Sequence, residues 1–136
     1  MAALTGAVID TLALVGHLND SLPKGAADLF RAAENGEGVL YLPEIALGEF
    51  AYLALRGRLG LEHPRALVEE VVDQVRAGGY IRLSALDATG WGIFLDLNVP
   101  ELHDRLIAAD AVARRVPLVT NDRELANIPE LARVWD

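Results

Sequence analysis

Four acidic residues stand at positions where a charged side chain is unusual. Asp10 is the only Asp, Glu, Lys or Arg between residues 2 and 18, and it ends a short apolar run. Glu49 has only apolar residues three and four positions away in either direction, so on a helix its carboxylate falls on an apolar stripe. Asp104 precedes apolar residues at helical spacing, and Asp122 follows another apolar run. These are the residues with the greatest potential for chemistry.

Each acid taken alone also has a structural explanation. Asp favours helix N-caps, which would account for Asp10 and Asp122. A salt bridge to an arginine would account for Glu49, and the helix dipole for Asp104. Four convergent carboxylates would instead repel one another without cations, and oxygen ligands of this kind suit one or two Mg²⁺ or Mn²⁺ ions. Such ions can activate water and stabilise the leaving oxygen in phosphodiester cleavage.

The elements that must position these acids alternate between strands and helices. Apolar runs predict strands at residues 7–9, 39–42, 80–83, 117–120 and 133–135. Helices are predicted directly after Asp10 and over residues 23–34, 43–58, 64–77 and 100–115. Residues 88–95 are ambiguous because two glycines weaken a helix there. Two further acids need no special role, since Glu44 suits a helix N-terminus and Asp110 pairs with Arg114 at helical spacing.

This alternation predicts one domain over residues 1–136, a three-layer α/β/α sandwich with a central, mainly parallel sheet. In such folds ligands bind at the carboxyl ends of the strands. Asp10 and Asp122 directly follow predicted strands, whereas Glu49 and Asp104 lie on predicted helices. The topology can therefore bring all four acids to one edge of the sheet.

Composition narrows the class of protein. The 136 residues are 52% hydrophobic and 24% charged and include no cysteine, which is typical of a soluble domain without disulfides. Twenty acidic and twelve basic residues give a formal net charge of −8, which repels nucleic acid unless a bound cation neutralises the site. Because Asp10 interrupts the apolar N-terminal stretch, we expect neither a signal peptide nor a membrane span, and a cytoplasmic location.

Other catalytic patterns are absent from the sequence. There is no phosphate-binding Gly-rich loop with Lys-Ser/Thr, no Gly-x-Ser-x-Gly elbow and no thiol nucleophile. The three histidines lack zinc-ligand spacing, and His103, beside Asp104, is expected at the surface. An acceptor-aspartate phosphotransfer domain would also place acids at strand ends. Lys24, the only lysine, is remote from these acids, which disfavours that interpretation.

Four segments resemble the motifs of PIN-domain nucleases. Residues 8–11 (VIDT) are similar to the first strand and its Asp, and residues 42–50 (LPEIALGEF) to a second motif in which a Glu follows six residues after a proline. Residues 103–109 (HDRLIAA) resemble the third motif, an Asp that leads an alanine-rich helix. Residues 117–125 (PLVTNDREL) resemble the fourth, a strand that ends in Thr-x-Asp. The third and fourth motifs are the most specific.

Within that family the chain looks most like VapC-type toxins of toxin–antitoxin pairs. The resemblance implies a Mg²⁺- or Mn²⁺-dependent endoribonuclease with an RNA substrate, a homodimer, and a cognate antitoxin as partner. It implies a catalytic metal site formed by Asp10, Glu49, Asp104 and Asp122. It also implies supporting roles for Thr11, Thr120 and Glu124.

Two residues depart from the family pattern. Leu12 stands where many members have a polar Asn or Ser, and Leu125 replaces the more frequent Phe. Residues 60–100 carry no recognisable motif. An alternative is therefore a PIN-like domain that is catalytically weak or inactive and binds RNA or an antitoxin. Arginines near the motifs could position an RNA strand, although surface solubility is the simpler role for each: Arg56, Arg58, Arg105 and Arg123.

Overall fold

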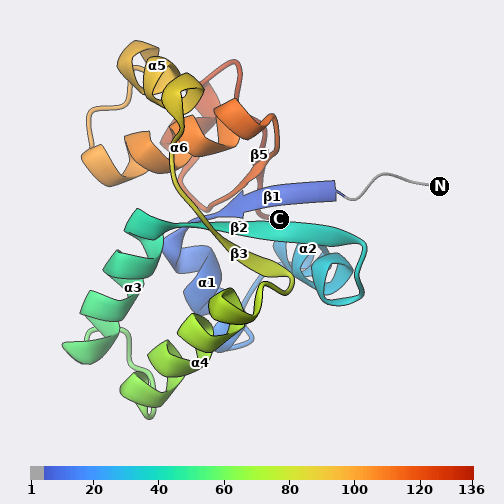
Figure 1. Cartoon of the computed structure of the whole chain (residues 1–136), viewed down its shortest axis with the longest axis vertical. Helices are drawn as coiled ribbons and strands as arrows, with labels where there is room; N and C mark the ends of the chain where they lie inside the picture. The colour runs from blue at the N-terminus through green and yellow to red at the C-terminus, as the bar shows by residue number, and fades with distance from the viewer. Residues whose placement is uncertain (1–4) are drawn as a thin grey trace.

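A five-stranded parallel sheet forms the centre of the computed structural model, which describes residues 5–136 (Figure 1). The strands are β1 (Thr5–Ile9), β2 (Gly38–Pro43), β3 (Ile81–Ser84), β4 (Leu118–Val119) and β5 (Arg133–Val134). Their order across the sheet is β3-β2-β1-β4-β5, and every neighbouring pair is parallel. In the centre, Val8 of β1 pairs with Tyr41 of β2 on one side and Leu118 of β4 on the other.

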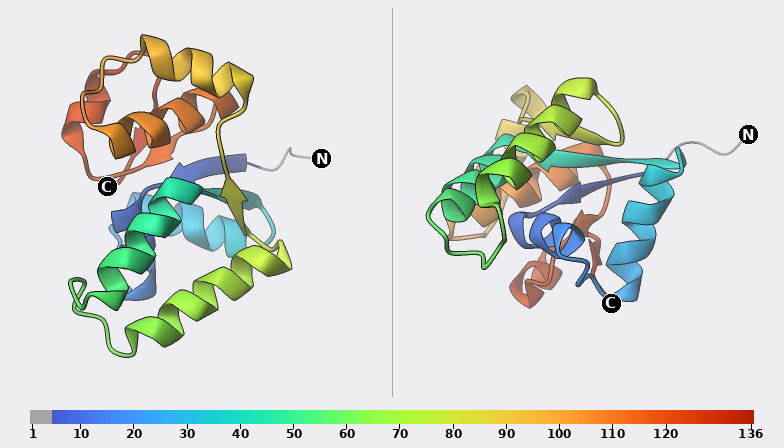
Figure 2. Two further views of the ribbon diagram at one scale, coloured as in Figure 1. Left: turned by 60° about the vertical axis from the view of Figure 1, so that its left-hand side comes forward. Right: turned by 90° about the horizontal axis from the view of Figure 1, so that it is seen from below.

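Helices cover both faces of this sheet, which confirms the predicted three-layer α/β/α architecture. They are α1 (Thr11–Leu18), α2 (Lys24–Glu34), α3 (Glu44–Leu55), α4 (Pro64–Ala77), α5 (Ala88–Asp96) and α6 (Leu102–Arg114), followed by a 3₁₀ turn, η1 (Arg123–Asn127). Helices α5 and α6 lie on one side of the sheet and α1, α2 and α4 on the other (Figures 1 and 2). Helix α3 extends from the carboxyl end of β2 and packs against α1, α4 and α6.

The sheet is buried because its strands carry apolar side chains on both faces. Val8, Ile9, Leu118 and Val119 have no exposed surface, and Phe50 of α3 is equally buried. Continuous apolar runs of this kind are typical of parallel strands that helices cover on both sides. The strands predicted at residues 7–9, 39–42, 80–83, 117–120 and 133–135 correspond to β1 to β5, with small differences at their ends.

Two helix boundaries differ from the predicted ones for local reasons. The helix predicted over 43–58 ends at Leu55, because Gly57 takes a left-handed conformation with φ of 71°. The helix predicted over 100–115 begins at Leu102 and not at Pro100, because the side chain of Glu101 caps it by accepting a hydrogen bond from the Asp104 N–H at 2.7 Å.

The ambiguous segment 88–95 is helical, and its glycine explains the weak sequence signal. Asp87 caps α5 by accepting a hydrogen bond from the Gly90 N–H at 2.9 Å. A Cβ at position 90 would lie 2.9 Å from Cδ2 and 3.2 Å from Cβ of Leu86, so the glycine allows Leu86 to pack closely against α5. No helix in the described part of the chain is long and apolar enough to span a membrane.

Candidate functional site

Two of the four predicted acids meet because they follow neighbouring parallel strands. Asp10 directly follows β1, and Asp122 lies three residues beyond the end of β4. The two strands are paired through Ile9 and Val119, and the Asp10 N–H donates to the Val119 carbonyl at 3.3 Å. Both acids therefore stand at the carboxyl edge of the sheet, as the alternating topology predicts.

Asp10 is both a helix cap and a member of this cluster, so the two explanations are compatible. Its Oδ1 accepts a hydrogen bond from the Ala13 N–H at 2.8 Å, which caps α1. Burial raises the pKa of Asp10 above its ordinary value. Hydrogen bonds from Thr120 and Ala13 lower that pKa, and the negative charges of Glu49 and Asp122 raise it.

The hydroxyl of Thr120 connects the two strand-end acids. Thr120 is only 1% exposed. Its side chain is hydrogen-bonded to Asp10, and its Oγ1 accepts from the Asp122 N–H at 3.1 Å. Asp122 in turn caps η1, since its Oδ1 accepts from the Glu124 N–H at 2.9 Å. One buried hydroxyl thus links the carboxylate of Asp10 to the backbone of Asp122.

Helices α3 and α6, which pack against each other, supply the other two acids. Glu49 lies in the middle of α3 beside the buried Phe50 and is itself half-buried. Within residues 5–136 no arginine or lysine forms an ion pair with Glu49, so the salt-bridge explanation for this residue is wrong. Asp104 lies in the first turn of α6, where the helix dipole also favours it.

The side chains of all four acids line one pocket of about 350 Å³, which we call the acidic pocket. Its remaining walls are Thr11, Leu12, His103, Ile107, Thr120 and Asn121. Burial raises the pKa of Asp104 to about 6, and the negative charges of Glu101, Asp122, Asp10 and Glu49 contribute in that order. The raised pKa of Asp104 therefore reflects burial first and the neighbouring carboxylates second.

The donor set of the acidic pocket suits a hard divalent cation that keeps part of its water shell. The described residues contain no group of three or more His, Cys, Asp or Glu side chains arranged to hold a metal ion by themselves. Mg²⁺ is commonly bound through one or two carboxylates, with waters and substrate phosphates as its other ligands. Burial first and neighbouring carboxylates second raise the pKa values of Asp10 and Asp104, and a bound cation would favour the charged forms of both side chains.

The predicted supporting residues occupy three different places. Thr120 lies between Asp10 and Asp122, as described above. Thr11 lines the acidic pocket, but its hydroxyl donates to the Ala46 carbonyl at 3.4 Å and so ties α1 to α3. Glu124 is exposed and lines an adjoining pocket of about 590 Å³, which it shares with Asp104 and Asp122. Glu124 is thus next to the cluster and outside the acidic pocket itself.

Sequence reasoning missed Glu101, which organises the start of α6. Its Oε2 accepts from the Asp104 N–H, and its Oε1 lies 2.6 Å from Nδ1 of His103. The hydrogen bond from Glu101 raises the pKa of His103, which is partly exposed and lines the acidic pocket. A Glu three residues before a helical Asp is the signal that could have revealed this cap, but the proline at position 100 suggested an earlier helix start.

The four arginines near the motifs differ in their contacts. Arg105 donates to the carbonyls of Phe94 and Leu95 at 2.7 and 3.1 Å and so holds α5 against α6. Arg56 donates to the hydroxyl of Tyr52 on α3. The side chains of Arg58 and Arg123 are exposed and, within the described residues, form no hydrogen bond or ion pair.

Comparisons with known proteins identify one family. The PIN domain family matches residues 7–131 of the chain. A search of curated protein sequences gives no significant match.

Several solved structures share this fold at low sequence identity. VapBC2 from Rickettsia felis, bound to a DNA fragment from its promoter, is 20% identical, with a TM-score of 0.73 over 97% of this chain and 100% of that chain. VapBC-5 from Mycobacterium tuberculosis, a member of the VapBC family of toxin-antitoxin systems, is 17% identical, with a TM-score of 0.63 over 97% and 99%. FitAcB from Neisseria gonorrhoeae is 19% identical, with a TM-score of 0.63 over 93% and 95%. At these identities the likeness demonstrates a common fold.

Proposed function

The chain belongs to the PIN domain family, and from that premise we propose that it is a metal-dependent endoribonuclease, the toxin of a type II toxin–antitoxin pair. PIN domains are generally nucleases that use divalent metals. The observation that carries the proposal is the convergence of Asp10, Glu49, Asp104 and Asp122, from four separate segments, on the acidic pocket. Convergent carboxylates are stable together only when cations or protons compensate them.

In this proposal the four acids hold Mg²⁺ or Mn²⁺. When bound, the ion supplies Lewis acidity and an activated water for cleavage of an RNA phosphodiester. Thr120 keeps the carboxylate of Asp10 and the backbone of Asp122 in fixed orientation, and Thr11 anchors α3, which carries Glu49. Because the chain has a net charge of −8, cation binding at this edge is also what allows a polyanion to approach.

The proposed partners follow from the same family relationship. The structural neighbours include VapBC toxin-antitoxin structures, which supports an antitoxin as the cognate partner of this chain. We also propose that the chain forms a homodimer and acts in the cytoplasm. An antitoxin that reaches the acidic pocket would inhibit the enzyme by excluding RNA.

Leu12 supports a second candidate function, a PIN-like module that binds RNA or an antitoxin without cutting. Its side chain is 59% exposed and lines the acidic pocket next to Asp10. A leucine offers no polar atom to position a water or to support the carboxylate of Asp10. Under this alternative RNA is bound and not hydrolysed.

Calorimetric titration with Mn²⁺ is the first test, because it does not require the correct RNA. We expect the wild-type protein to bind Mn²⁺ and the Glu49→Gln variant to bind it much more weakly. Glu69→Gln is the matched control, since Glu69 is exposed on α4 and pairs only with Arg65. Equal binding by wild type and Glu49→Gln would remove Glu49 from the site.

Cleavage of a mixed RNA pool then separates the two functions. Metal-dependent cleavage that Asp104→Asn abolishes supports the nuclease. Binding of the same pool without cleavage, unaffected by chelation, supports the binding module.

A further inference from the structure

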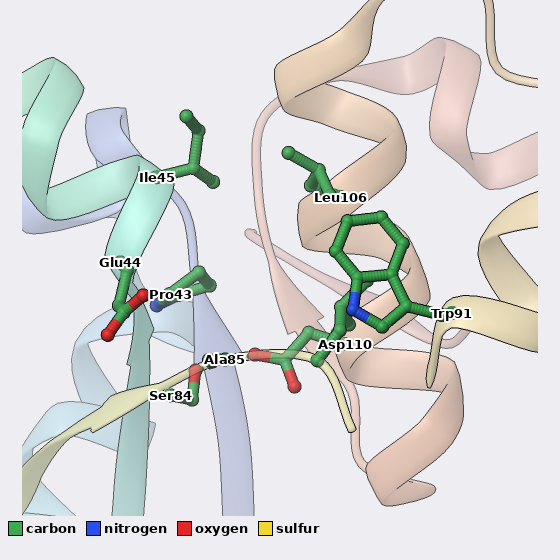
Figure 3. Close-up of a pocket in the computed structure, with 9 residues that line it drawn as sticks. Pro43, Glu44, Ile45, Ser84, Ala85, Trp91, Leu106 and Asp110 are labelled. Carbon is green, nitrogen blue, oxygen red and sulfur yellow. Dashed lines mark hydrogen bonds between the residues drawn. The ribbon is translucent and has the colours of Figure 1, made fainter. Parts of the chain in front are cut away.

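A second pocket of about 350 Å³, which we call the Trp91 pocket, lies between α3, α5 and α6 (Figure 3). Ile45 of α3 stands opposite Leu106 of α6 and the indole of Trp91, and Ser84 and Asp110 lie below them in this view. Its size and its apolar walls with few polar groups are typical of a small-molecule or nucleobase site.

The buried polar groups of the Trp91 pocket are internally satisfied. Asp110 is 3% exposed, and its Oδ2 accepts from the hydroxyl of Ser84 at 2.5 Å. Its Oδ1 accepts from Nε of Arg114 at 2.8 Å, so the predicted Asp110–Arg114 pair is confirmed. The side chain of Glu44, by contrast, is exposed at the edge of the pocket and forms no hydrogen bond or ion pair within the described residues. In Figure 3 its carboxylate is directed past Pro43, so Glu44 is an acceptor at the rim of the pocket that a ligand can reach by a change of side-chain rotamer.

Trp91 provides an aromatic surface at the mouth of the pocket. Its side chain is 50% exposed, although tryptophan has the largest apolar surface of any residue. Phe94 holds the indole in an edge-to-face arrangement, with 5.2 Å between the ring centroids. An ordered, half-exposed ring of this kind is suited to stacking on a planar ligand.

The Trp91 pocket adjoins the acidic pocket along two shared helices. On α6, Leu106 lies two residues beyond Asp104, and on α3, Glu49 lies four residues beyond Ile45. At 1.5 Å and 100° per residue, Glu49 lies about 6 Å from Ile45 on the same face of α3, whereas Leu106 is turned about 160° from Asp104 around α6. Both pockets also stand at the carboxyl edge of the sheet, because Ser84 ends β3 and Asp10 follows β1. A single strand of RNA along this edge can engage both pockets.

We propose that the Trp91 pocket binds an unpaired nucleobase of the RNA, next to the phosphate that occupies the acidic pocket. This inference rests on the proposed nuclease function and assigns the residues that select the substrate. Sequence-specific recognition of RNA typically uses splayed bases that stack on aromatic rings and are read at their edges. A free carboxylate accepts hydrogen bonds only, so Glu44 favours bases with an exocyclic amino group over uracil, which presents two carbonyl oxygens beside its one N–H.

Tryptophan fluorescence tests the pocket without requiring metal or cleavage. In a Trp135→Phe background Trp91 is the only tryptophan. We expect adenosine, guanosine and cytidine to quench its fluorescence in the presence of a chelator, and uridine to quench it more weakly. In Glu44→Gln this preference against uridine is expected to diminish. Absence of quenching by all four nucleosides would overturn the proposal.

Affinity for RNA provides the second measurement, made in the presence of Mn²⁺ on otherwise wild-type protein, with a phosphorothioate-linked probe so that cleavage is suppressed. Trp91→Ala is expected to weaken binding of an unstructured oligoribonucleotide by roughly 5- to 150-fold, the range for loss of one base–aromatic stack. Trp91→Phe is expected to recover most of the affinity. Leu95→Ala is the matched control, because Leu95 lies on α5, is 74% exposed and does not line the pocket.

The outcomes separate this inference from the proposed function. RNA cleavage with no effect of Trp91→Ala on binding refutes the base pocket and leaves the nuclease intact. Nucleoside quenching without metal binding or cleavage supports the base pocket and refutes the nuclease. Light scattering covers one further case: if Trp91→Ala converts a dimer to a monomer and nucleosides do not quench, the pocket is an interface between two copies and the proposal is wrong.

Discussion

Replacement of Asp104 by asparagine is expected to stabilise the metal-free protein at neutral pH. The pKa of Asp104 is raised from 3.8 to about 6 by burial and by four neighbouring carboxylates. In the unfolded chain these neighbours are dispersed, so the carboxyl has its ordinary pKa near 3.9. Between about pH 4 and pH 6 the folded protein therefore binds a proton that the unfolded chain has lost, and the free energy of unfolding falls as the pH rises through this window.

The size of the effect follows from the same shift. Two pKa units correspond to about 3 kcal/mol at full strength. Because Asp104 is partly exposed, solvent screening reduces this to about 1 kcal/mol, and loss of the favourable charge near the start of α6 subtracts a few tenths. We expect Asp104→Asn to gain roughly 0.5–1 kcal/mol at pH 7, which raises Tm by about 2–4 °C, and to gain almost nothing at pH 4.

Urea and thermal unfolding with a chelator, from pH 4 to pH 8, measure this difference. Asp73→Asn is the matched control, because Asp73 is exposed on α4 and pairs with Arg76, so its loss gives no gain in stability. In the presence of Mn²⁺ the order is expected to reverse, since the ion stabilises the wild type by mass action. If Asp104→Asn were less stable than wild type at pH 7 without metal, the mutual repulsion inferred for the acidic pocket would be wrong.

Three further substitutions test the structure around the two pockets. Thr120→Val removes the hydroxyl that bonds to the side chain of Asp10 and the backbone of Asp122. It is expected to weaken Mn²⁺ binding by about 10- to 100-fold, the usual effect of losing a residue that orients metal ligands. An unchanged Mn²⁺ affinity in calorimetry would contradict this role for Thr120. Asp110→Ala leaves the side chains of Arg114 and Ser84 without their buried acceptor and is expected to lower the free energy of unfolding in urea by about 3 kcal/mol. A change near zero would mean that water replaces the Asp110 carboxylate as their partner. Gly90→Ala places a Cβ 2.9 Å from Cδ2 of Leu86. Because the Leu86 side chain can shift and alanine favours the helix over glycine, the net cost is expected to be at most about 1 kcal/mol in urea unfolding. Addition of Leu86→Ala should recover part of that loss, and full additivity of the two changes would contradict the proposed clash.

The sequence predicts the frame of this fold well because burial on both faces imposes continuous apolar strands. Residues 7–9 and 117–120 are recognisable for that reason, and their parallel pairing brings Asp10 and Asp122 together. The positions of Glu49 and Asp104 are less predictable, because the distance between them depends on how helices α3 and α6 pack against each other.

Non-local contacts explain what the sequence does not reveal. Glycine at position 90 weakens the helical pattern, although it allows the close packing of Leu86 against α5. The Trp91 pocket has walls from three helices and the end of β3, so no linear motif marks it. The competing explanations for Asp10 also could not be separated in the sequence, because the side chain both caps α1 and lies in the acidic pocket.

Because Asp10 caps α1, mutations at this position are expected to change the stability of the protein differently from mutations at Asp104. Replacement of Asp10 by alanine is expected to remove a helix cap as well as a carboxylate of the acidic pocket, at a cost of about 1 kcal/mol in stability, whereas asparagine would keep the cap. Replacement of Asp104 by asparagine is expected to relieve repulsion and to stabilise the metal-free protein. If the proposed activity is correct, inactive variants at Asp104 should therefore accumulate in cells as folded protein that still competes for the binding partners of the intact chain.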